Sequence, residues 1–368
     1  MLISIFIVAA SLVLFFAHYF LFFSLIEFFG LHRPTDQWTL GITLFVLAVS
    51  FIGSLFLNHW RENRFTRALY YVSGLWLGLL TNLVLGFAFV WLILIFFHFI
   101  GFHTDGLGLG RTAIAIALLY SAWGVWNASH FVIKRITVRI PNLPENWRGK
   151  KIIQLSDVHL GLTNREDFME KIAVAANEEK PAMVVITGDL FDGMDGDLLP
   201  FVAPIEDIQT EKGVYFVRGN HEIYVGLKEV TQALHCTKIR VLHDEVVDVD
   251  GLKIIGIEYP EDRHDEKVVD ILKRLQKDYL GSPNILLYHV PGYVKQIKKL
   301  GVNLELCGHT HKGQIFPFGF VTRLMFHGFD YGLHADGDFS IYTTSGTGSW
   351  GPPMRTEKRG EIVAITLE

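Results

Sequence analysis

Residues 151–159 read Lys-Ile-Ile-Gln-Leu-Ser-Asp-Val-His, an apolar stretch that ends in two potential metal ligands. The β-branched residues Ile152 and Ile153 favour a buried strand. Asp157 and His159 follow at once and are two residues apart, so an extended backbone projects both side chains to the same side. The stretch therefore predicts a strand that delivers a carboxylate and an imidazole to one place.

The same order, an apolar run and then polar residues, recurs four more times along the chain. The later runs end before Gly188-Asp189, Gly219-Asn220-His221-Glu222, His289 and Gly308-His309-Thr310-His311. In α/β folds, the loops after the carboxyl ends of strands gather at one edge of a sheet. We therefore expect the five motifs to meet. Strand patterns at 246–249, 252–257, 339–343 and 361–367 indicate a second, more antiparallel part of the sheet system.

Seven side chains in these motifs offer oxygen or imidazole donors. They are Asp157, His159, Asp189, Asn220, His289, His309 and His311. A donor set without thiolates suits manganese, iron or zinc, and seven ligands suit two ions that share a bridging carboxylate. Two such ions turn a bridging water into a hydroxide nucleophile and neutralise the phosphate oxygens. The pattern therefore predicts a two-metal hydrolase of phosphate esters, with manganese as the first choice.

The five motifs resemble the pattern of the calcineurin-like metallophosphoesterase superfamily, which is D-x-H, G-D-x-x-D, G-N-H-[DE], a single H and G-H-x-H. Residues 156–161 and 307–314 are similar to its bacterial membrane-associated branch. The resemblance runs from residue 151 to the C-terminus and implies a double β-sandwich flanked by helices. It implies one metal bound by Asp157, His159, Asp189 and His311, and a second bound by Asp189, Asn220, His289 and His309.

The resemblance also implies roles for residues beside the ligands. His221 matches the histidine that protonates the leaving group or stabilises the transition state, and Asp192 is expected to orient its ring. We expect Glu222 to be structural. Lys312 replaces a glycine that is frequent in the branch, and we expect it to face solvent, with a contact to substrate phosphate as the alternative. Arg355, in a glycine-rich tail, is a candidate anion contact.

The N-terminal third of the chain is strongly apolar. Hydrophobic residues make up 50% of the 368 residues, and they are concentrated before about Ile133. Four stretches are long enough to cross a bilayer as helices: 2–28, 38–57, 69–100 and 112–133. The third is long, and we expect one helix, with a hairpin near Thr81 and Asn82 as the alternative. We assign 1–135 to a transmembrane anchor, 136–150 to a linker and 151–368 to the phosphoesterase domain.

The distribution of basic residues favours a cytoplasmic catalytic domain. The second loop carries Arg61, Arg64 and Arg67, and further lysines and arginines follow the fourth span. With four spans, both regions lie on one side, which the positive-inside rule identifies as the cytoplasmic side of an inner or plasma membrane. The net charge of −5 provides no basic field, so we expect no nucleic-acid partner. Few polar residues lie within the spans, which argues against a transporter.

The leading hypothesis is hydrolysis of a phosphoester or pyrophosphate bond by a membrane-anchored enzyme. Because the domain is tethered to a bilayer, a phosphorylated, lipid-linked substrate is expected, and some relatives in the resembling branch cleave UDP-2,3-diacylglucosamine. The alternative is a non-catalytic membrane sensor or scaffold that binds a ligand without turnover. A protein of that kind is expected to lack a metal ligand or the catalytic histidine, and this chain keeps all of them.

Overall fold

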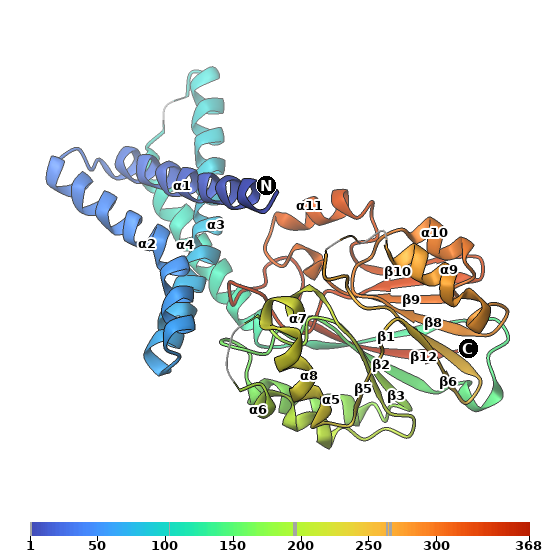
Figure 1. Ribbon diagram of the computed structural model, residues 1–368. Helices are drawn as coiled ribbons and strands as arrows, with labels where there is room; N and C mark the ends of the chain where they lie inside the picture. Colours follow the sequence, from blue (N-terminus) through green and yellow to red (C-terminus); the bar gives the residue numbers. More distant parts are fainter. Residues whose placement is uncertain (1, 103, 194–196, 263, 265–266) are drawn as a thin grey trace. The chain divides into compact units, whose positions relative to one another are not determined.

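The structure, a computed structural model, describes residues 2–102, 104–193, 197–262, 264 and 267–368 (Figure 1). The chain divides into two compact units. Unit 1 contains Met1–Trp126 and Gly351–Met354, and unit 2 contains Asn127–Trp350 and Arg355–Glu368.

Unit 1 is built from four long apolar helices, which confirms the four predicted spans. They are α1 (Leu2–Phe29), α2 (Pro34–Trp60), α3 (Arg64–Phe99) and α4 (Gly106–Ala128). Each is long and apolar enough to cross a membrane. Helix α3 runs through 36 residues, so the third apolar stretch is one helix and not a hairpin.

Polar side chains inside unit 1 pair with one another between helices. Trp76 Nε1 donates to His18 Nε2 at 3.0 Å, and Asn82 Nδ2 donates to Ser121 Oγ at 2.8 Å. Such pairs satisfy polar groups that would otherwise face hydrocarbon. These contacts support the interpretation of unit 1 as an anchor, in which polar residues hold helices together.

Unit 2 contains two six-stranded sheets. The first has the order β1 (Val132–Val138), β12 (Glu361–Leu367), β2 (Lys151–Leu155), β3 (Met183–Thr187), β4 (Val214–Val217) and β5 (Ile239–Val241). The second has the order β10 (Gly332–Asp336), β11 (Phe339–Thr343), β9 (Leu304–Cys307), β8 (Asn284–Leu287), β7 (Leu252–Gly256) and β6 (Glu245–Val249). Strands β2, β3 and β4 are parallel neighbours, as are β7, β8 and β9.

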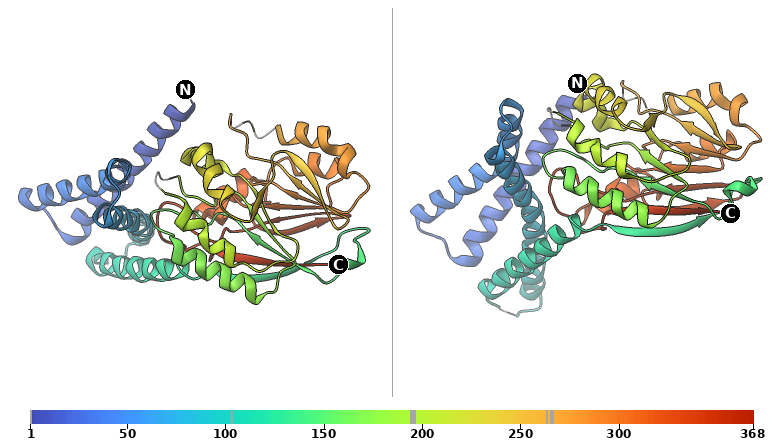
Figure 2. Two further views of the ribbon diagram at one scale, coloured as in Figure 1. Left: turned by 60° about the horizontal axis from the view of Figure 1, so that its bottom comes forward. Right: turned by 90° about the horizontal axis from the view of Figure 1, so that it is seen from below.

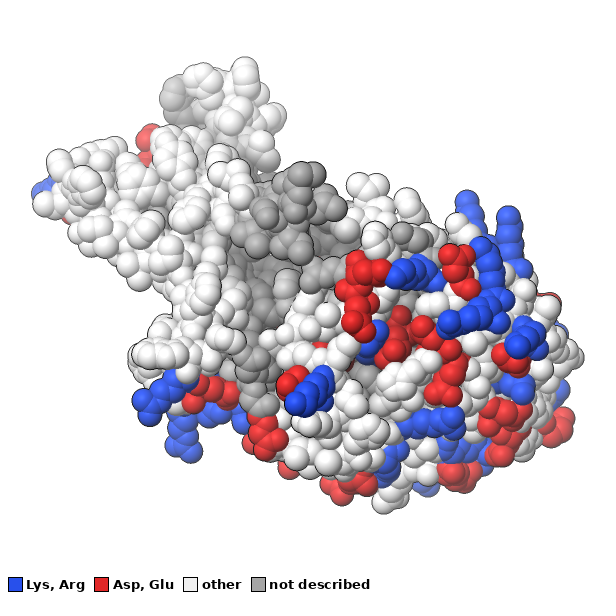
Figure 3. All heavy atoms as spheres, in the orientation of Figure 1, with Lys and Arg blue, Asp and Glu red and all other residues white. Residues whose placement is uncertain are grey.

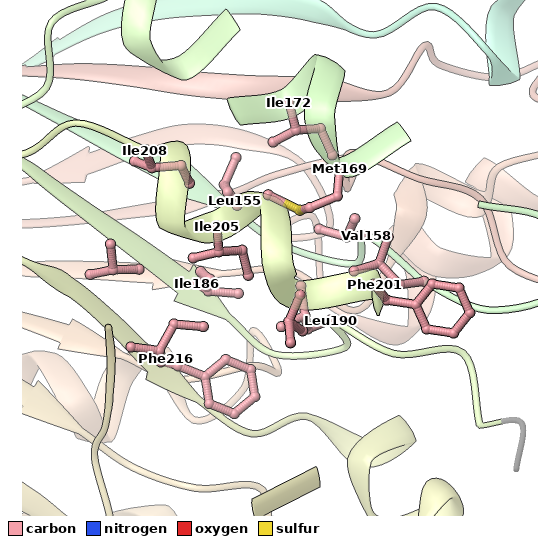
Figure 4. Close-up of a cluster of buried hydrophobic side chains, with 14 of the residues drawn as sticks. Leu155, Val158, Met169, Ile172, Ile186, Leu190, Phe201, Ile205, Ile208 and Phe216 are labelled. Atoms are coloured by element: carbon pink, nitrogen blue, oxygen red, sulfur yellow. The ribbon is translucent and has the colours of Figure 1, made fainter. Parts of the chain in front are cut away.

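The two sheets pack face to face, with helices on their outer faces (Figure 2). Side chains of both sheets, such as Val185 and Leu287, share one buried cluster between them. Figure 4 shows Met169 and Ile172 of α5 among the side chains that cover the other face of the first sheet. Helices α9 and α10 pack on the second sheet. This is the predicted double β-sandwich flanked by helices.

The helices of unit 2 are mostly short. They are η1 (Glu145–Trp147), α5 (Glu166–Glu178), α6 (Leu199–Val202), η2 (Ala203–Asp207), α7 (Asn220–Val225), α8 (Leu227–His235), α9 (Lys267–Tyr279), α10 (Val294–Lys299), η3 (His311–Gly313) and α11 (Phe318–Met325). Figure 3 shows acidic and basic side chains interspersed over the visible face of this unit. That face therefore presents no field of a single sign.

The sheet system begins earlier in the chain than the predicted start at residue 151. Strand β1 spans the predicted boundary between the anchor (1–135) and the linker (136–150). It pairs in parallel with β12 from Val132 to Val138. The fourth predicted span, 112–133, extends past the end of α4 at Ala128. Its last apolar residues, Phe131 and Ile133, pack against the core of unit 2. The sequence pattern could not separate them, because apolar residues of α4 and apolar residues of the unit 2 core follow one another directly along the chain.

Candidate metal centre

The five motifs meet at the carboxyl edges of the two sheets. Asp157 and Asp189 follow β2 and β3 of the first sheet, whereas His289 and His309 follow β8 and β9 of the second. The backbone N–H of His309 donates to the Asp157 carboxylate at 2.9 Å, which joins the two edges. Residues up to 154 positions apart therefore share one site, because parallel strands end at the same edge.

Five of the seven candidate ligands have a left-handed backbone conformation. The φ angle is 51° at Asp157, His159 and Asp189, 69° at His309 and 48° at His311. For a residue with a side chain, this conformation costs on the order of 1–3 kcal/mol. Such strain persists only where the surrounding structure fixes it, and it concentrates at functional sites. The loops therefore hold these side chains in directions that an unstrained backbone would not give.

One group of buried donors contains Asp157, His159 and His311. The Nε2 atoms of the two histidines lie 3.0 Å apart, and Asp157 Oδ1 lies 3.4 Å from His311 Nε2. A neutral imidazole has one N–H and one lone pair, so at most part of this cluster can be satisfied by internal hydrogen bonds. Oxygen and imidazole donors that converge in this way fit a divalent transition metal.

A second group is centred on His289. Its Nε2 atom lies 3.1 Å from Asp189 Oδ2, 3.2 Å from Asn220 Oδ1 and 3.2 Å from His309 Nδ1. Its other nitrogen, Nδ1, lies 2.8 Å from the carbonyl oxygen of Thr187, to which it can donate. In the neutral ring with its proton on Nδ1, the Nε2 lone pair would face two oxygens and a second imidazole nitrogen. A cation among these atoms would remove the repulsion between their lone pairs.

Asp189 belongs to both sides of the site. Its carboxylate forms one close group with His159 and His221, and another with His289 and His309, in each of which the ligand atoms lie within 4.8 Å of one another. Burial raises the pKa of Asp189, but the charge and hydrogen bond of His289 outweigh that effect and hold the pKa well below its usual range. The residue is therefore an ionised carboxylate placed between two donor groups.

The histidines divide into one charged and several neutral rings. Burial lowers the pKa of His289, but attraction to Asp189 outweighs it and raises the pKa to about 10. Burial, followed by repulsion from His289, lowers the pKa of His309 to about 3. Burial, followed by repulsion from His159 and Arg355, holds the pKa of His311 well below its usual range. The proton on His289 thus occupies a place that suits a cation.

Glu222 on α7 fixes the geometry of the two central loops. Its carboxylate accepts backbone hydrogen bonds from Asp189 (3.0 Å), Leu190 (2.8 Å), Phe191 (3.2 Å) and Gly219 (2.6 Å). Burial, followed by repulsion from Asp189, raises the pKa of Glu222 to about 7. The residue ties the Gly-Asp loop to the Gly-Asn-His-Glu loop, which is the structural role expected from the sequence.

The structure places Asp192 differently from the expectation. His221 Nδ1 lies 2.9 Å from the backbone carbonyl oxygen of Asp192, and the Asp192 carboxylate lies 3.3 Å from His159 Nδ1. Its backbone carbonyl therefore accepts from the His221 ring, whereas its carboxylate lies beside a candidate metal ligand, and neither Asp192 Oδ1 nor His159 Nδ1 has a hydrogen-bond partner among the described residues. Burial raises the pKa of this carboxyl group to about 7. The spacing of the motif could not distinguish these two contacts.

Two basic residues also take places that the sequence left open. Arg355 is fully buried, and its Nη2 atom lies 3.0 Å from His311 Nδ1 and donates to the Ser345 carbonyl oxygen at 2.7 Å. The Lys312 ammonium group pairs with Asp330 at 2.8 Å, instead of facing solvent alone. Asp330 lies outside every motif, so no sequence pattern could predict this pairing.

Comparison with known proteins agrees with this arrangement. A family model described as calcineurin-like phosphoesterase matches residues 150–313. An uncharacterized metallophosphoesterase of Campylobacter jejuni is 35% identical over 64% of this chain, and the match covers 63% of that relative. A transmembrane protein with metallophosphoesterase domain from Danio rerio is 33% identical over 80% of this chain and 74% of its own length.

A third relative matches along nearly its whole length. It is an uncharacterized metallophosphoesterase of Aquifex aeolicus, 32% identical over 69% of this chain and 98% of that protein. The chain thus spans less than two thirds of the Campylobacter relative but nearly all of the Aquifex one. With its sandwich fold and its five motifs at one edge, the chain belongs to the calcineurin-like phosphoesterase family.

Proposed function

We propose that the protein is a membrane-anchored phosphoesterase that uses two divalent metal ions to hydrolyse a phosphoester or pyrophosphate bond. The observation that carries this proposal is the position of Asp189, whose carboxylate lies in one close donor group with His159 and His221 and in another with His289 and His309. The first ion would be held by Asp157, His159, Asp189 and His311, and the second by Asp189, Asn220, His289 and His309. Manganese is the first choice and iron or zinc the alternative, because the donors are oxygens and imidazoles.

Two bound ions would supply an activated water and neutralise the charge of the phosphate. The chain itself supplies the fixed positions on which that chemistry depends. Glu222 holds the loop that carries Asp189, and the Asp192 carboxylate lies against His159. These supporting contacts would keep the ligands in place before substrate arrives, which favours catalysis.

His221 is proposed to transfer the proton to the leaving group. Its Nδ1 atom can donate to the Asp192 carbonyl oxygen, which leaves Nε2 as the atom that exchanges a proton with substrate. Burial, followed by repulsion from His159, lowers the pKa of His221 in the protein without metal. The rings of Tyr224 and Trp350 lie 5.2 and 5.9 Å from the His221 ring, so aromatic groups flank this position.

The substrate is proposed to be lipid-linked and to be cleaved at the cytoplasmic face. The four apolar helices support this proposal, because they confine the enzyme to a bilayer where such substrates are concentrated. UDP-2,3-diacylglucosamine is the specific candidate, on the resemblance to the membrane-associated branch. The non-catalytic alternative receives no support from the site, since the described residues include all seven ligands and His221.

The test combines metal analysis with a substrate panel. Full-length protein is stripped with a chelator and reloaded with manganese, iron or zinc, and bound metal is counted. The panel contains p-nitrophenyl phosphate, bis(p-nitrophenyl) phosphate and UDP-2,3-diacylglucosamine. Asp189→Asn is expected to lose bound metal and to lower turnover by more than about 100-fold, since even residues behind the ligands contribute 10- to 100-fold. Asp278→Asn, at an exposed position on α9, is the matched control.

Each outcome decides one part of the proposal. Full metal content and full activity in the Asp189→Asn variant would reject the bridging role. Cleavage of the aryl phosphates but not of UDP-2,3-diacylglucosamine would keep the phosphoesterase and reject that substrate. Two bound ions with no turnover on any substrate would favour the binding-only alternative.

A further inference from the structure

Helix α11 (Phe318–Met325) turns its apolar side chains outward. Six large apolar residues on this helix or directly before it are exposed: Phe316, Phe318, Phe320, Val321, Leu324 and Met325. The most exposed is Leu324, with 79% of its surface accessible. Single exposed apolar residues are ordinary, but a contiguous group on one helix marks an interaction surface.

The inward face of α11 is small and polar. Gly319 is buried, and a side chain there would collide with Glu357, so the helix lies close against its support. Thr322 Oγ1 donates to the Asp330 carboxylate at 3.2 Å, and Lys312 pairs with the same carboxylate at 2.8 Å. The usual amphipathic pattern of a helix in a soluble domain is therefore reversed. These contacts fix the outward direction of the apolar face.

We propose that the apolar face of α11 inserts into the lipid bilayer, where it contacts the hydrocarbon just below the headgroups. The same chain carries four helices long enough to span a membrane, so unit 2 is never far from lipid. The helix has no acidic residue, and its one charged residue, the exposed Arg323, suits anionic headgroups. Exposed Phe and Leu beside a basic residue are typical of helices that lie in the membrane interface.

The proposed lipid-binding face is connected directly to the candidate metal centre. Phe326, at the end of α11, lies 6.0 Å from the His309 ring, centroid to centroid. Thr310 Oγ1 donates to the Asp330 carbonyl oxygen at 2.6 Å, so Asp330 contacts both α11 and the loop that carries His309 and His311. Insertion of α11 would bring the loop that carries His309 and His311 close to the lipid surface.

The test places an environment-sensitive fluorophore on α11 in the full-length protein. In a Cys236→Ser background, which removes the exposed cysteine and keeps the buried Cys307, the variants Leu324→Cys and Phe320→Cys are labelled with nitrobenzoxadiazole maleimide. Val174→Cys is the matched control, because Val174 is an apolar residue on α5 that is 61% exposed. Each variant is reconstituted into vesicles with and without nitroxide-labelled lipid, and its metal content is checked.

Insertion predicts that emission at positions 320 and 324 shifts to shorter wavelength and that nitroxide lipid quenches most of it. The probe at position 174 should show neither effect. Equal quenching at all three positions, or none at positions 320 and 324, would overturn the proposal. Cross-linking of the unlabelled Leu324→Cys variant into dimers without lipid quenching would also overturn it, since a second copy would then cover the face. None of these readouts depends on catalytic activity.

Discussion

His289 is the residue at which a proton and a metal ion compete most directly. In the protein without metal, attraction to Asp189 outweighs the effect of burial and raises the pKa of His289 to about 10, so its ring is protonated at pH 7. Ligation through Nε2 would require that this proton leaves. The affinity for metal should therefore rise with pH up to about pH 10, because a higher pH weakens the competing proton.

We expect manganese binding at pH 7 to release about one proton from His289, and the apparent affinity to rise about tenfold per pH unit from this group alone. Isothermal titration calorimetry in two buffers of different ionisation enthalpy measures the released proton. A His289→Gln variant should lose this component and retain any release from Asp192, whose pKa is raised to about 7 by burial. An affinity that does not change between pH 6 and pH 8 would contradict the assignment of His289 as a ligand.

The residues that the sequence identified are those that follow strands directly. Asp157, Asp189 and His309 could be predicted as neighbours because strand order and motif order agree. The supporting contacts could not be predicted, because they involve backbone atoms or distant side chains. Arg355 lies against His311 across 44 positions, and Glu222 binds four backbone N–H groups. The spacing of residues within one motif cannot predict contacts of this kind.

Among the loop elements, the turn after β9 depends on the absence of a side chain at Gly308. A Cβ atom there would lie 1.9 Å from Ser156 Oγ and 2.1 Å from Asp157 Oδ2. The two sheet edges approach so closely that the Asp157 carboxylate would have to move. At Gly292, in the loop before α10, a Cβ atom would have no described atom within 4 Å, apart from its chain neighbours.

Gly308→Ala is therefore expected to reduce metal binding in the group that contains Asp157 and to lower the free energy of unfolding by about 1–3 kcal/mol, as overpacking does. Metal content by mass spectrometry and a thermal unfolding midpoint measure the two effects. Gly292→Ala is the matched control and should leave both unchanged. If Gly308→Ala bound metal as tightly as the parent protein, the position of the Asp157 carboxylate could not be critical.

Helix α11 shows why an element can be missed when its neighbours are predicted. Its sequence, Phe-Gly-Phe-Val-Thr-Arg-Leu-Met, is apolar enough to resemble a segment of the core. The role of the helix depends on which of its faces points outward. Gly319 and Thr322 determine this, because they face Glu357 and Asp330 on the inward side. Those partners are distant in sequence or lie outside every motif, so periodicity alone could not determine which face is buried.

At the scale of the whole molecule, the chain joins four apolar helices to an α/β sandwich, and the proposed orientation in the membrane can be tested directly. The basic residues of the second loop and of the segment after α4 fall on the same side when four helices cross. The protein offers a natural probe of that side, because Cys236 is exposed on unit 2 and Cys307 is buried. The accessible thiol of Cys236 therefore reports the location of unit 2.

We expect a membrane-impermeant maleimide to leave Cys236 unlabelled in intact cells and to label it once the membrane is permeabilised, because the orientation proposed from the positive-inside rule has unit 2 in the cytoplasm. In a Cys236→Ser background, His32→Cys should behave in the opposite way, since His32 is exposed in the loop between α1 and α2. Labelling at Cys236 and at the His32→Cys position together controls for access of the reagent and for the integrity of the cells. Labelling of Cys236 in intact cells, with protection of the cysteine at position 32, would reverse the orientation. The metal centre would then face the outer side, and a substrate confined to the cytoplasmic leaflet would be excluded.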